Sequence, residues 1–141
     1  MDNCLSLPFD QYQRYKLVSD IINKFRTGEK KFKILDVEAG FEENLKKFLP
    51  LDDIFCLDKE YPPEYTLKEK FIAGDIFKVE FKEKYDFVVA VDVYEHIPKI
   101  NRKKFIDILI PLSEIATILA ATFDQDEVRR CEFFANEVYR N

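Results

Sequence analysis

Short apolar runs alternate along the chain with segments whose apolar residues recur every three or four positions. An apolar run without polar alternation predicts a strand buried on both faces, whereas the wider spacing predicts an amphipathic helix. The predicted strands cover residues 32–37, 54–57, 71–73, 85–91 and 117–123. The predicted helices cover residues 15–25, 41–49, 65–70, 101–116 and 127–139.

Several residues mark where the predicted helices begin, bend and end. Gly28 follows the first helix as a stop signal. Glu42 and Glu43 open the second, because carboxylates suit the positive end of a helix dipole. Asn101 is a capping residue type at the start of the fourth helix, and Pro111 is expected to kink it.

Buried strands that alternate with helices favour a mainly parallel sheet covered by helices on both faces. This is the doubly wound, Rossmann-like α/β fold. A chain of 141 residues is long enough to bury the core of one such domain, so we expect a single domain over residues 1–141.

Composition narrows the class of protein. Hydrophobic residues make up 47% of the chain, which argues against disorder. The net charge is −5 with acids and bases interleaved, so a nucleic acid is not the expected partner. Neither a signal peptide nor a membrane-spanning run is recognisable. Cys4, Cys56 and Cys131 form no CxxC pair, which favours a reducing, cytoplasmic location over a disulfide framework or a zinc site, and Cys56 is expected in the core.

Acidic residues lie at the carboxyl ends of the predicted strands. They are Asp36, Asp58, Asp75, Asp92 and Asp124. Any one of them could be an ordinary loop or capping residue. Ligands of open α/β sheets bind beyond the carboxyl ends of the strands, so the whole series favours a ligand site there.

Asp58 is the most informative member of this series. It follows the second predicted strand and lies eighteen residues after Gly40. An acid at this place and distance typically accepts hydrogen bonds from the hydroxyl groups of a ribose.

The turn after the first strand discriminates between nucleotides. Its sequence, residues 36–43, holds four carboxylates and only one glycine, Gly40. A pyrophosphate needs a glycine-rich turn and would be repelled by these charges, which disfavours NAD, FAD and ATP. A ligand with adenosine, no phosphate and a sulfonium fits better, and S-adenosylmethionine is such a ligand.

At these residues the sequence resembles the class I S-adenosylmethionine-dependent methyltransferases. Residues 34–42 overlie the family's first motif, in which Asp36 and Gly40 match while Glu38 and Glu42 stand in place of glycines. The segment 74–76 resembles the adenine site, and residues 85–97 resemble the fourth strand with its Asp-Val-x-Glu-His segment. The resemblance runs from about residue 12 to about residue 139.

The resemblance implies a sheet of about five strands in the order 3-2-1-4-5, without the family's usual two further C-terminal strands. It also implies S-adenosylmethionine as cofactor. The cofactor-binding residues that it implies are Asp36, Gly40, Asp58, Asp75, Ile76 and Asp92. The uncharged run 117–123 would then lie at a sheet edge, so we expect the chain to self-associate through this edge or to be part of a longer protein.

Two functions stay open at this point. The first is methyl transfer to a small molecule or sugar, with Glu95 and His96 as weak catalytic candidates. His96 could instead cap or pack in the loop after the fourth strand, which is the favoured interpretation, and Glu95 could lie at a helix entry. Tyr12 and Arg14 could cover the methionine carboxylate or belong only to the surface of a packing helix. The alternative is a non-catalytic module with weak or lost cofactor affinity, which the glycine-poor first turn favours. The methyl acceptor is not indicated.

Overall fold

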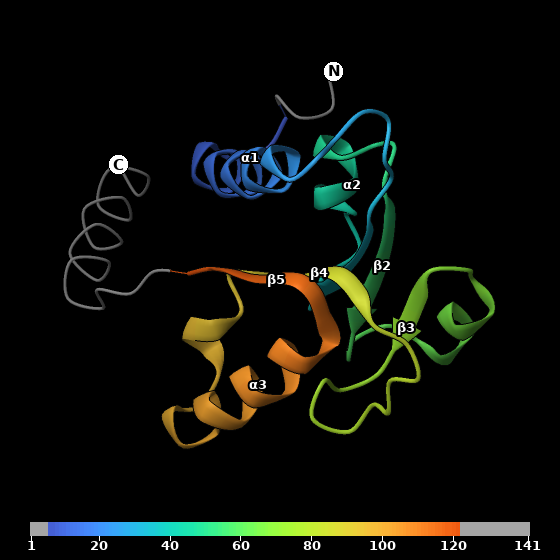
Figure 1. Ribbon diagram of the computed structural model, residues 1–141. Helices are drawn as coiled ribbons and strands as arrows, with labels where there is room; N and C mark the ends of the chain where they lie inside the picture. Colours follow the sequence, from blue (N-terminus) through green and yellow to red (C-terminus); the bar gives the residue numbers. More distant parts are fainter. Residues whose placement is uncertain (1–5, 122–141) are drawn as a thin grey trace.

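Five parallel strands form one sheet in the order β3-β2-β1-β4-β5 in the computed structural model, which describes residues 6–121 (Figure 1). The strands are β1 (Lys33–Val37), β2 (Asp53–Asp58), β3 (Phe71–Ala73), β4 (Tyr85–Val91) and β5 (Ser113–Ala120). The doubly wound fold and the strand order predicted above are therefore confirmed. Residues 122 and 123, Asp124, the predicted helix 127–139, Cys4 and Cys131 lie outside the described residues.

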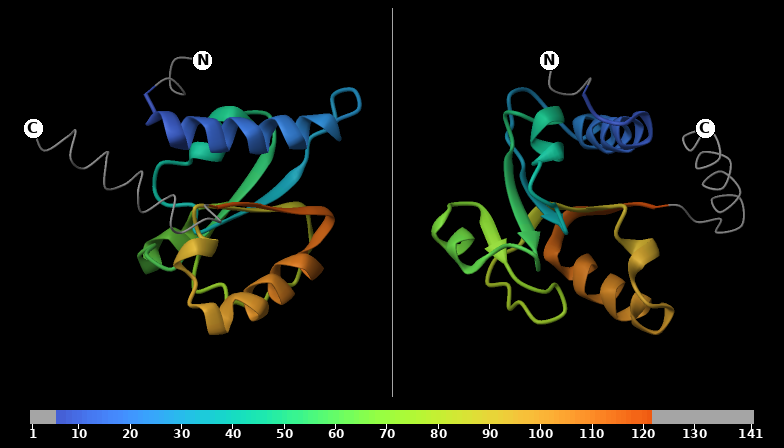
Figure 2. Two further views of the ribbon diagram at one scale, coloured as in Figure 1. Left: turned by 90° about the vertical axis from the view of Figure 1, so that its left-hand side faces the viewer. Right: turned by 180° about the vertical axis from the view of Figure 1, so that it is seen from behind.

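Helices cover both faces of the sheet. The helices are α1 (Phe9–Lys24), α2 (Asn44–Phe48) and α3 (Lys99–Leu112), and two short 3₁₀ helices are η2 (Pro63–Leu67) and η3 (Tyr94–His96). Figures 1 and 2 show α1 and α2 on one face and α3 on the other. No helix within residues 6–121 is long and apolar enough to cross a membrane.

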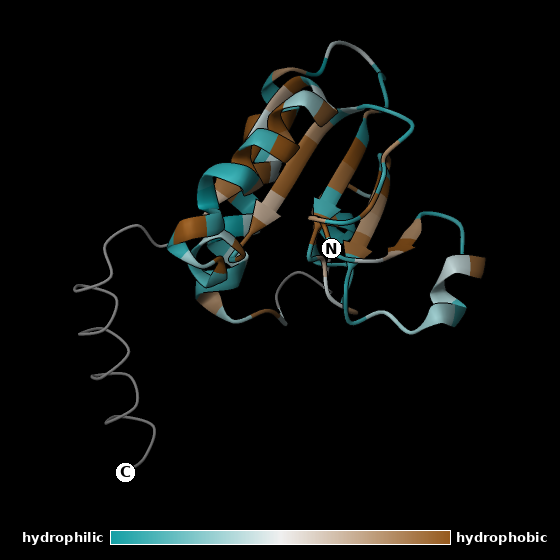
Figure 3. Ribbon diagram, turned by 90° about the horizontal axis from the view of Figure 1, so that it is seen from below, coloured by the Kyte–Doolittle hydropathy of each residue, from teal (hydrophilic) through white to brown (hydrophobic). Residues whose placement is uncertain are grey.

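Successive strand residues enter different cores because side chains alternate across a sheet. On the α1 side, Ile34 and Phe87 pack with Val18 and Ile22. On the α3 side, Leu35 and Val88 pack with a second set of residues that includes Phe105 and Leu109. Figure 3 shows the apolar residues concentrated along the strands. Cys56 is buried in the core, as its apolar surroundings in the sequence predicted.

The fourth predicted helix is shorter than expected. It ends at Leu112, and β5 begins at Ser113, so Ala116 lies opposite Phe87 of β4 rather than on a helix. Pro98 occupies the N-terminal capping position of α3, so Asn101 does not cap this helix. Pro111 lies in the last turn of α3. The helical spacing continued past residue 112, but the β-branched residues from 115 to 118 favour a strand when a buried strand is beside them.

The other boundaries shift for local reasons. The second helix begins at Asn44 and not at residue 41, because Glu43 at its start has a left-handed backbone with φ 48°. The predicted short helix 65–70 is the 3₁₀ helix η2, which has Pro63 as its first residue. Pro at this position fits because its missing N–H is one that a helix start leaves unpaired anyway.

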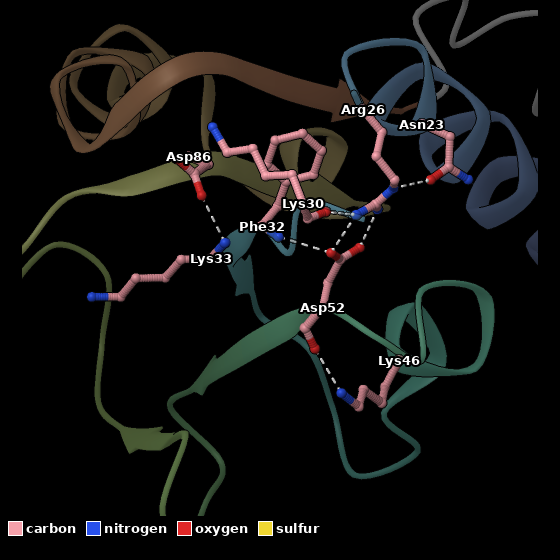
Figure 4. Close-up of polar contacts among 8 residues, drawn as sticks. All are labelled: Asn23, Arg26, Lys30, Phe32, Lys33, Lys46, Asp52 and Asp86. Atoms are coloured by element: carbon pink, nitrogen blue, oxygen red, sulfur yellow. Dashed lines mark hydrogen bonds and ion pairs between the residues drawn. The ribbon is translucent and has the colours of Figure 1, made fainter. Parts of the chain in front are cut away.

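An ion pair with a buried carboxylate ties together the loops before β1 and β2 (Figure 4). The Asp52 carboxylate is 1% exposed and accepts two hydrogen bonds from Arg26, at 2.8 and 2.5 Å. It also accepts one from the backbone N–H of Phe32 at 2.8 Å. These bonds fix the loop before β1 against the loop before β2. The carboxyl ends of the strands lie at the opposite end of the sheet.

Candidate functional site

A pocket of about 300 Å³ lies at the carboxyl ends of the strands. It brings together predicted site residues from the ends of β1, β3 and β4, which are far apart in sequence. The lining residues are Glu38, Lys59, Asp75, Ile76, Phe77, Asp92, Val93, His96, Ile97 and Pro98. This is the place where open parallel sheets bind their ligands.

Asp58 and Gly40 are bonded to each other at the rim of β1 and β2. The Asp58 carboxylate accepts the N–H of Gly40 at 2.9 Å and the N–H of Glu60 at 2.8 Å, one on each oxygen. A carboxylate has about four acceptor positions, so both oxygens keep capacity for a ligand hydroxyl. Gly40 has φ 69°, a left-handed backbone that glycine adopts without strain, and its carbonyl accepts a hydrogen bond from the Tyr61 hydroxyl.

Asp75 is placed by a tight turn after β3. Its carboxylate accepts the N–H of Phe77 at 2.9 Å, and its carbonyl accepts the N–H groups of residues 78 and 79. Gly74 precedes it, and a Cβ there would lie 2.5 Å from Val79 Cγ2. The glycine therefore allows the close packing that brings Asp75 and Ile76 to the pocket.

Asp36 is not among the residues that line the pocket. It belongs to β1, is 2% exposed, and its Oδ2 has no hydrogen-bond partner among the described residues. Burial, with a smaller contribution from the charge of Asp58, raises the pKa of Asp36 to about 7. Since the charged form is disfavoured there, Asp36 carries less negative charge near neutral pH than its sequence suggests.

Glu38 occupies a position where the resemblance places a glycine, and its backbone has the left-handed conformation that glycine adopts most easily. Its φ is 55°, in the left-handed region that L residues rarely adopt. The side chain is half-buried and lines the pocket. Burial first, and then the charge of Asp58, raises the pKa of the Glu38 carboxyl to about 7. Glu42, the second glycine replacement, is exposed and is not among the pocket residues.

Asp92 connects the pocket to α1. Its Oδ2 accepts a hydrogen bond from Arg14 at 2.8 Å, and both side chains are 28% exposed. Its backbone has φ 58°, and its N–H donates to the carbonyl of Ala120 at 2.7 Å, which fixes the end of β4 against β5. Its Oδ1 is buried without a hydrogen-bond partner in residues 6–121.

The two weak catalytic candidates have different surroundings. His96 is exposed at the end of η3 and lines the pocket. Glu95 has a buried Oε2 without a partner in the described part of the chain, but it is not a lining residue. Of the two residues before the first strand, Arg14 reaches Asp92, whereas Tyr12 packs its ring against Phe48, with centroids 5.5 Å apart.

A larger pocket lies at the opposite end of the sheet. It measures about 570 Å³ and is formed by the loops around residues 26–31 and 48–52. It contains none of the strand-ending acids, and its Arg26 and Asp52 are already paired with each other. Position and chemistry therefore favour the smaller pocket as the functional site.

Sequence reasoning missed several lining residues. Lys59 and Val93 directly follow the strand-ending acids Asp58 and Asp92, and that adjacency could have identified them. Phe77, Ile97 and Pro98 reach the pocket from turns whose direction has no local sequence signal.

The pocket fits an adenosine-containing ligand in three respects. Asp58 does not itself line the pocket and is buried, but it directly precedes the lining residue Lys59 and is an acceptor at the border for a ribose. Asp75 and Ile76 offer a carboxylate beside an apolar surface for an adenine, and Asp92 contributes a carboxylate to the lining. One feature opposes the ligand: the Glu38 side chain occupies space that a glycine would leave open.

The chain matches no family model, and no curated protein is detectably similar to it in sequence. It does resemble solved structures. CalS10, an amino pentose methyltransferase from Micromonospora echinaspora with bound SAM, superposes with a TM-score of 0.64 at 13% identity, covering 88% of this chain and 55% of that one. The sugar N-methyltransferase KedS8 from Streptoalloteichus sp. gives a TM-score of 0.61 at 14% identity, covering 80% of this chain and 49% of that one.

Magnesium protoporphyrin IX methyltransferase from Synechocystis, with bound SAH, gives a TM-score of 0.61 at 15% identity, covering 93% of this chain and 68% of that one. The chain thus spans about half the length of the first two of these structures and about two thirds of the third. The described part of this chain has the fold of the class I S-adenosylmethionine-dependent methyltransferases.

Proposed function

We propose that this chain is the cofactor-binding domain of an S-adenosylmethionine-dependent methyltransferase that acts on a small molecule or a sugar. The observation that carries the proposal is the pocket at the carboxyl ends of the strands, where Asp75, Ile76 and Asp92 converge beside Asp58. Three solved structures with this fold are methyltransferases, and two of them act on sugars by their names. We further propose that residues 1–141 form one domain and that the protein acts in the cytoplasm.

Each proposed site residue has a defined task. Asp58 accepts the ribose hydroxyls while it holds the N–H of Gly40 and so fixes the first turn. Asp75 accepts the exocyclic amine of the adenine, and Ile76 packs against the ring. Asp92 faces the amino-acid end of the cofactor from the pocket lining, and Asp36, which does not line the pocket, acts on the cofactor only through the turn that follows β1.

The bound cofactor would supply an electrophilic methyl group. The chain's part is to hold the acceptor in line with that group, because methyl transfer depends mainly on proximity and orientation. His96, on the pocket wall, would accept a proton from the acceptor where one must leave.

Calorimetric titration of the protein with S-adenosylmethionine tests the proposal. We expect saturable binding that is weak for a methyltransferase, because Glu38 narrows the pocket. Absence of binding in both the wild type and a Glu38→Gly variant would contradict the proposal and favour the non-catalytic module.

Replacement of Glu38 by glycine should tighten binding of the demethylated product, S-adenosylhomocysteine. Glycine removes a side chain from the pocket and adopts φ 55° without strain. This product has no sulfonium charge, so its affinity reports the space in the pocket. Glu42→Gly is the matched control, because Glu42 is exposed and its replacement should leave the affinity unchanged. Equal affinities for wild type and Glu38→Gly would show that the Glu38 side chain does not obstruct the site.

The outer edge of β5 supports a second proposal, that the chain self-associates. Among residues 6–121, β5 pairs only with β4, and its residues 115–120 carry no charge. Free N–H and C=O groups at such an edge readily pair with another chain. We expect light scattering to show a mass that rises with concentration, and the amides of residues 116–120 to exchange slowly. A monomer at every concentration, with fast exchange along β5, would contradict this expectation.

A further inference from the structure

The pocket has an unusual balance of charge for a nucleoside site. Three of its lining residues are carboxylates, Glu38, Asp75 and Asp92, whereas Lys59 is the one lysine or arginine among the described lining residues. Asp92 is paired with Arg14, which lies outside the lining set of this pocket. Glu38 and Asp75 have no such arginine or lysine partner among the ion pairs of the described residues.

Glu38 is held in the pocket and is not a side chain on a mobile surface. It directly follows β1, and its left-handed backbone turns the chain sharply there. The next residue, Ala39, is buried and donates its N–H to the carbonyl of Leu57 at 3.1 Å, which fixes the turn against β2. The backbone position of Glu38 at the pocket is therefore set by the sheet.

The charged groups around Glu38 are mostly acidic. Asp58, Glu60 and Asp75 oppose its ionisation, Lys59 favours it, and burial opposes it most, so that the pKa of Glu38 is raised to about 7. A carboxyl group in this state is stabilised in its charged form by any cation that enters the pocket. The charged carboxylate gives no such electrostatic stabilisation to a neutral ligand.

S-adenosylmethionine and S-adenosylhomocysteine differ by one methyl group and one positive charge. Their adenine, ribose and amino-acid contacts are shared, so the ratio of their affinities isolates the response of the site to the charge. A carboxylate about 8 Å from a cation, at an effective dielectric constant of about 20, changes affinity by roughly thirtyfold. Salt and partial protonation reduce this to roughly three- to tenfold.

We propose that Glu38 is a specificity-determining residue, which makes this pocket bind the positively charged methyl donor in preference to its neutral demethylated product. This inference rests on the proposed function. In a methyltransferase, such a preference would let the demethylated product dissociate readily and inhibit the enzyme weakly.

The test is a calorimetric comparison of both ligands with the wild type, Glu38→Gln and Glu42→Gln at pH 8. Glutamine keeps the bulk of Glu38 and removes its charge. We expect the donor-to-product affinity ratio to fall roughly three- to tenfold in Glu38→Gln and to stay at the wild-type value in Glu42→Gln, whose residue is exposed and does not line the pocket.

The pH dependence provides a second readout. Between pH 8 and pH 6 the wild-type ratio should fall as Glu38 takes up a proton, and the ratio of Glu38→Gln should change less, although Asp36 also titrates near pH 7 in both proteins. If both ligands bind but the ratio is the same in wild type and Glu38→Gln, this inference is wrong while the proposed function stands. If neither ligand binds even to Glu38→Gly, the proposed function itself fails.

Discussion

Asp58→Ala should weaken the binding of S-adenosylmethionine by about 1.5–3 kcal/mol, the usual value of hydrogen bonds to a charged group. The substitution removes the acceptor proposed for the ribose hydroxyls. It also releases the N–H groups of Gly40 and Glu60, which Asp58 holds at 2.9 and 2.8 Å, so the first turn loses its fixed shape. Both effects act in the same direction on the cofactor.

Calorimetry with three ligands separates the contribution of Asp58 from that of the adenine site. Affinity for S-adenosylmethionine and for adenosine should fall in Asp58→Ala, while affinity for adenine alone should change little. Asp53→Ala is the matched control, because Asp53 lies at the amino end of the same strand and is half-exposed. Equal binding of the cofactor by wild type and a folded Asp58→Ala protein would show that the pocket assignment is wrong.

Arg26→Ala should lower the free energy of unfolding by about 3–5 kcal/mol, because it leaves a buried carboxylate without its counter-ion. Asp52 is 1% exposed, and both hydrogen bonds that its carboxylate accepts from side chains come from Arg26 (Figure 4). After the substitution only the N–H of Phe32 would remain bonded to that carboxylate. Urea unfolding followed by circular dichroism measures the change.

Two further variants test whether the lost free energy of unfolding comes from the pair of Arg26 with Asp52. Lys16→Ala removes an exposed pair with Asp20 on α1 and should leave the free energy of unfolding nearly unchanged. The double variant Arg26→Met, Asp52→Leu should recover much of the loss, since apolar residues of similar volume often replace a buried ion pair without cost. A loss below about 1 kcal/mol in Arg26→Ala would contradict the view that this pair holds the two loops together.

The sequence by itself determined the architecture. Residues 85–91 form β4 within the predicted bounds because an apolar run has few alternatives to a strand buried on both faces. The acids at or near the strand ends were visible because each one interrupts an apolar run in the sequence, although the structure buries Asp36 and Asp58. The strand order came from the resemblance to a family, because no local pattern specifies which strands become neighbours.

The tertiary structure decided the ends of elements and the chemistry of the site. Ala116 belongs to a strand because β4 lies beside it, although its spacing is helical. The pairing of Arg14 with Asp92 joins residues 78 positions apart, and no periodicity predicts it. Glu38 looked like a lost glycine in the sequence, but its left-handed backbone, its place in the pocket and its raised pKa follow from the turn and from the burial around it. Local patterns report burial and backbone preference, whereas distances between remote side chains arise only when the sheet brings the strand ends together.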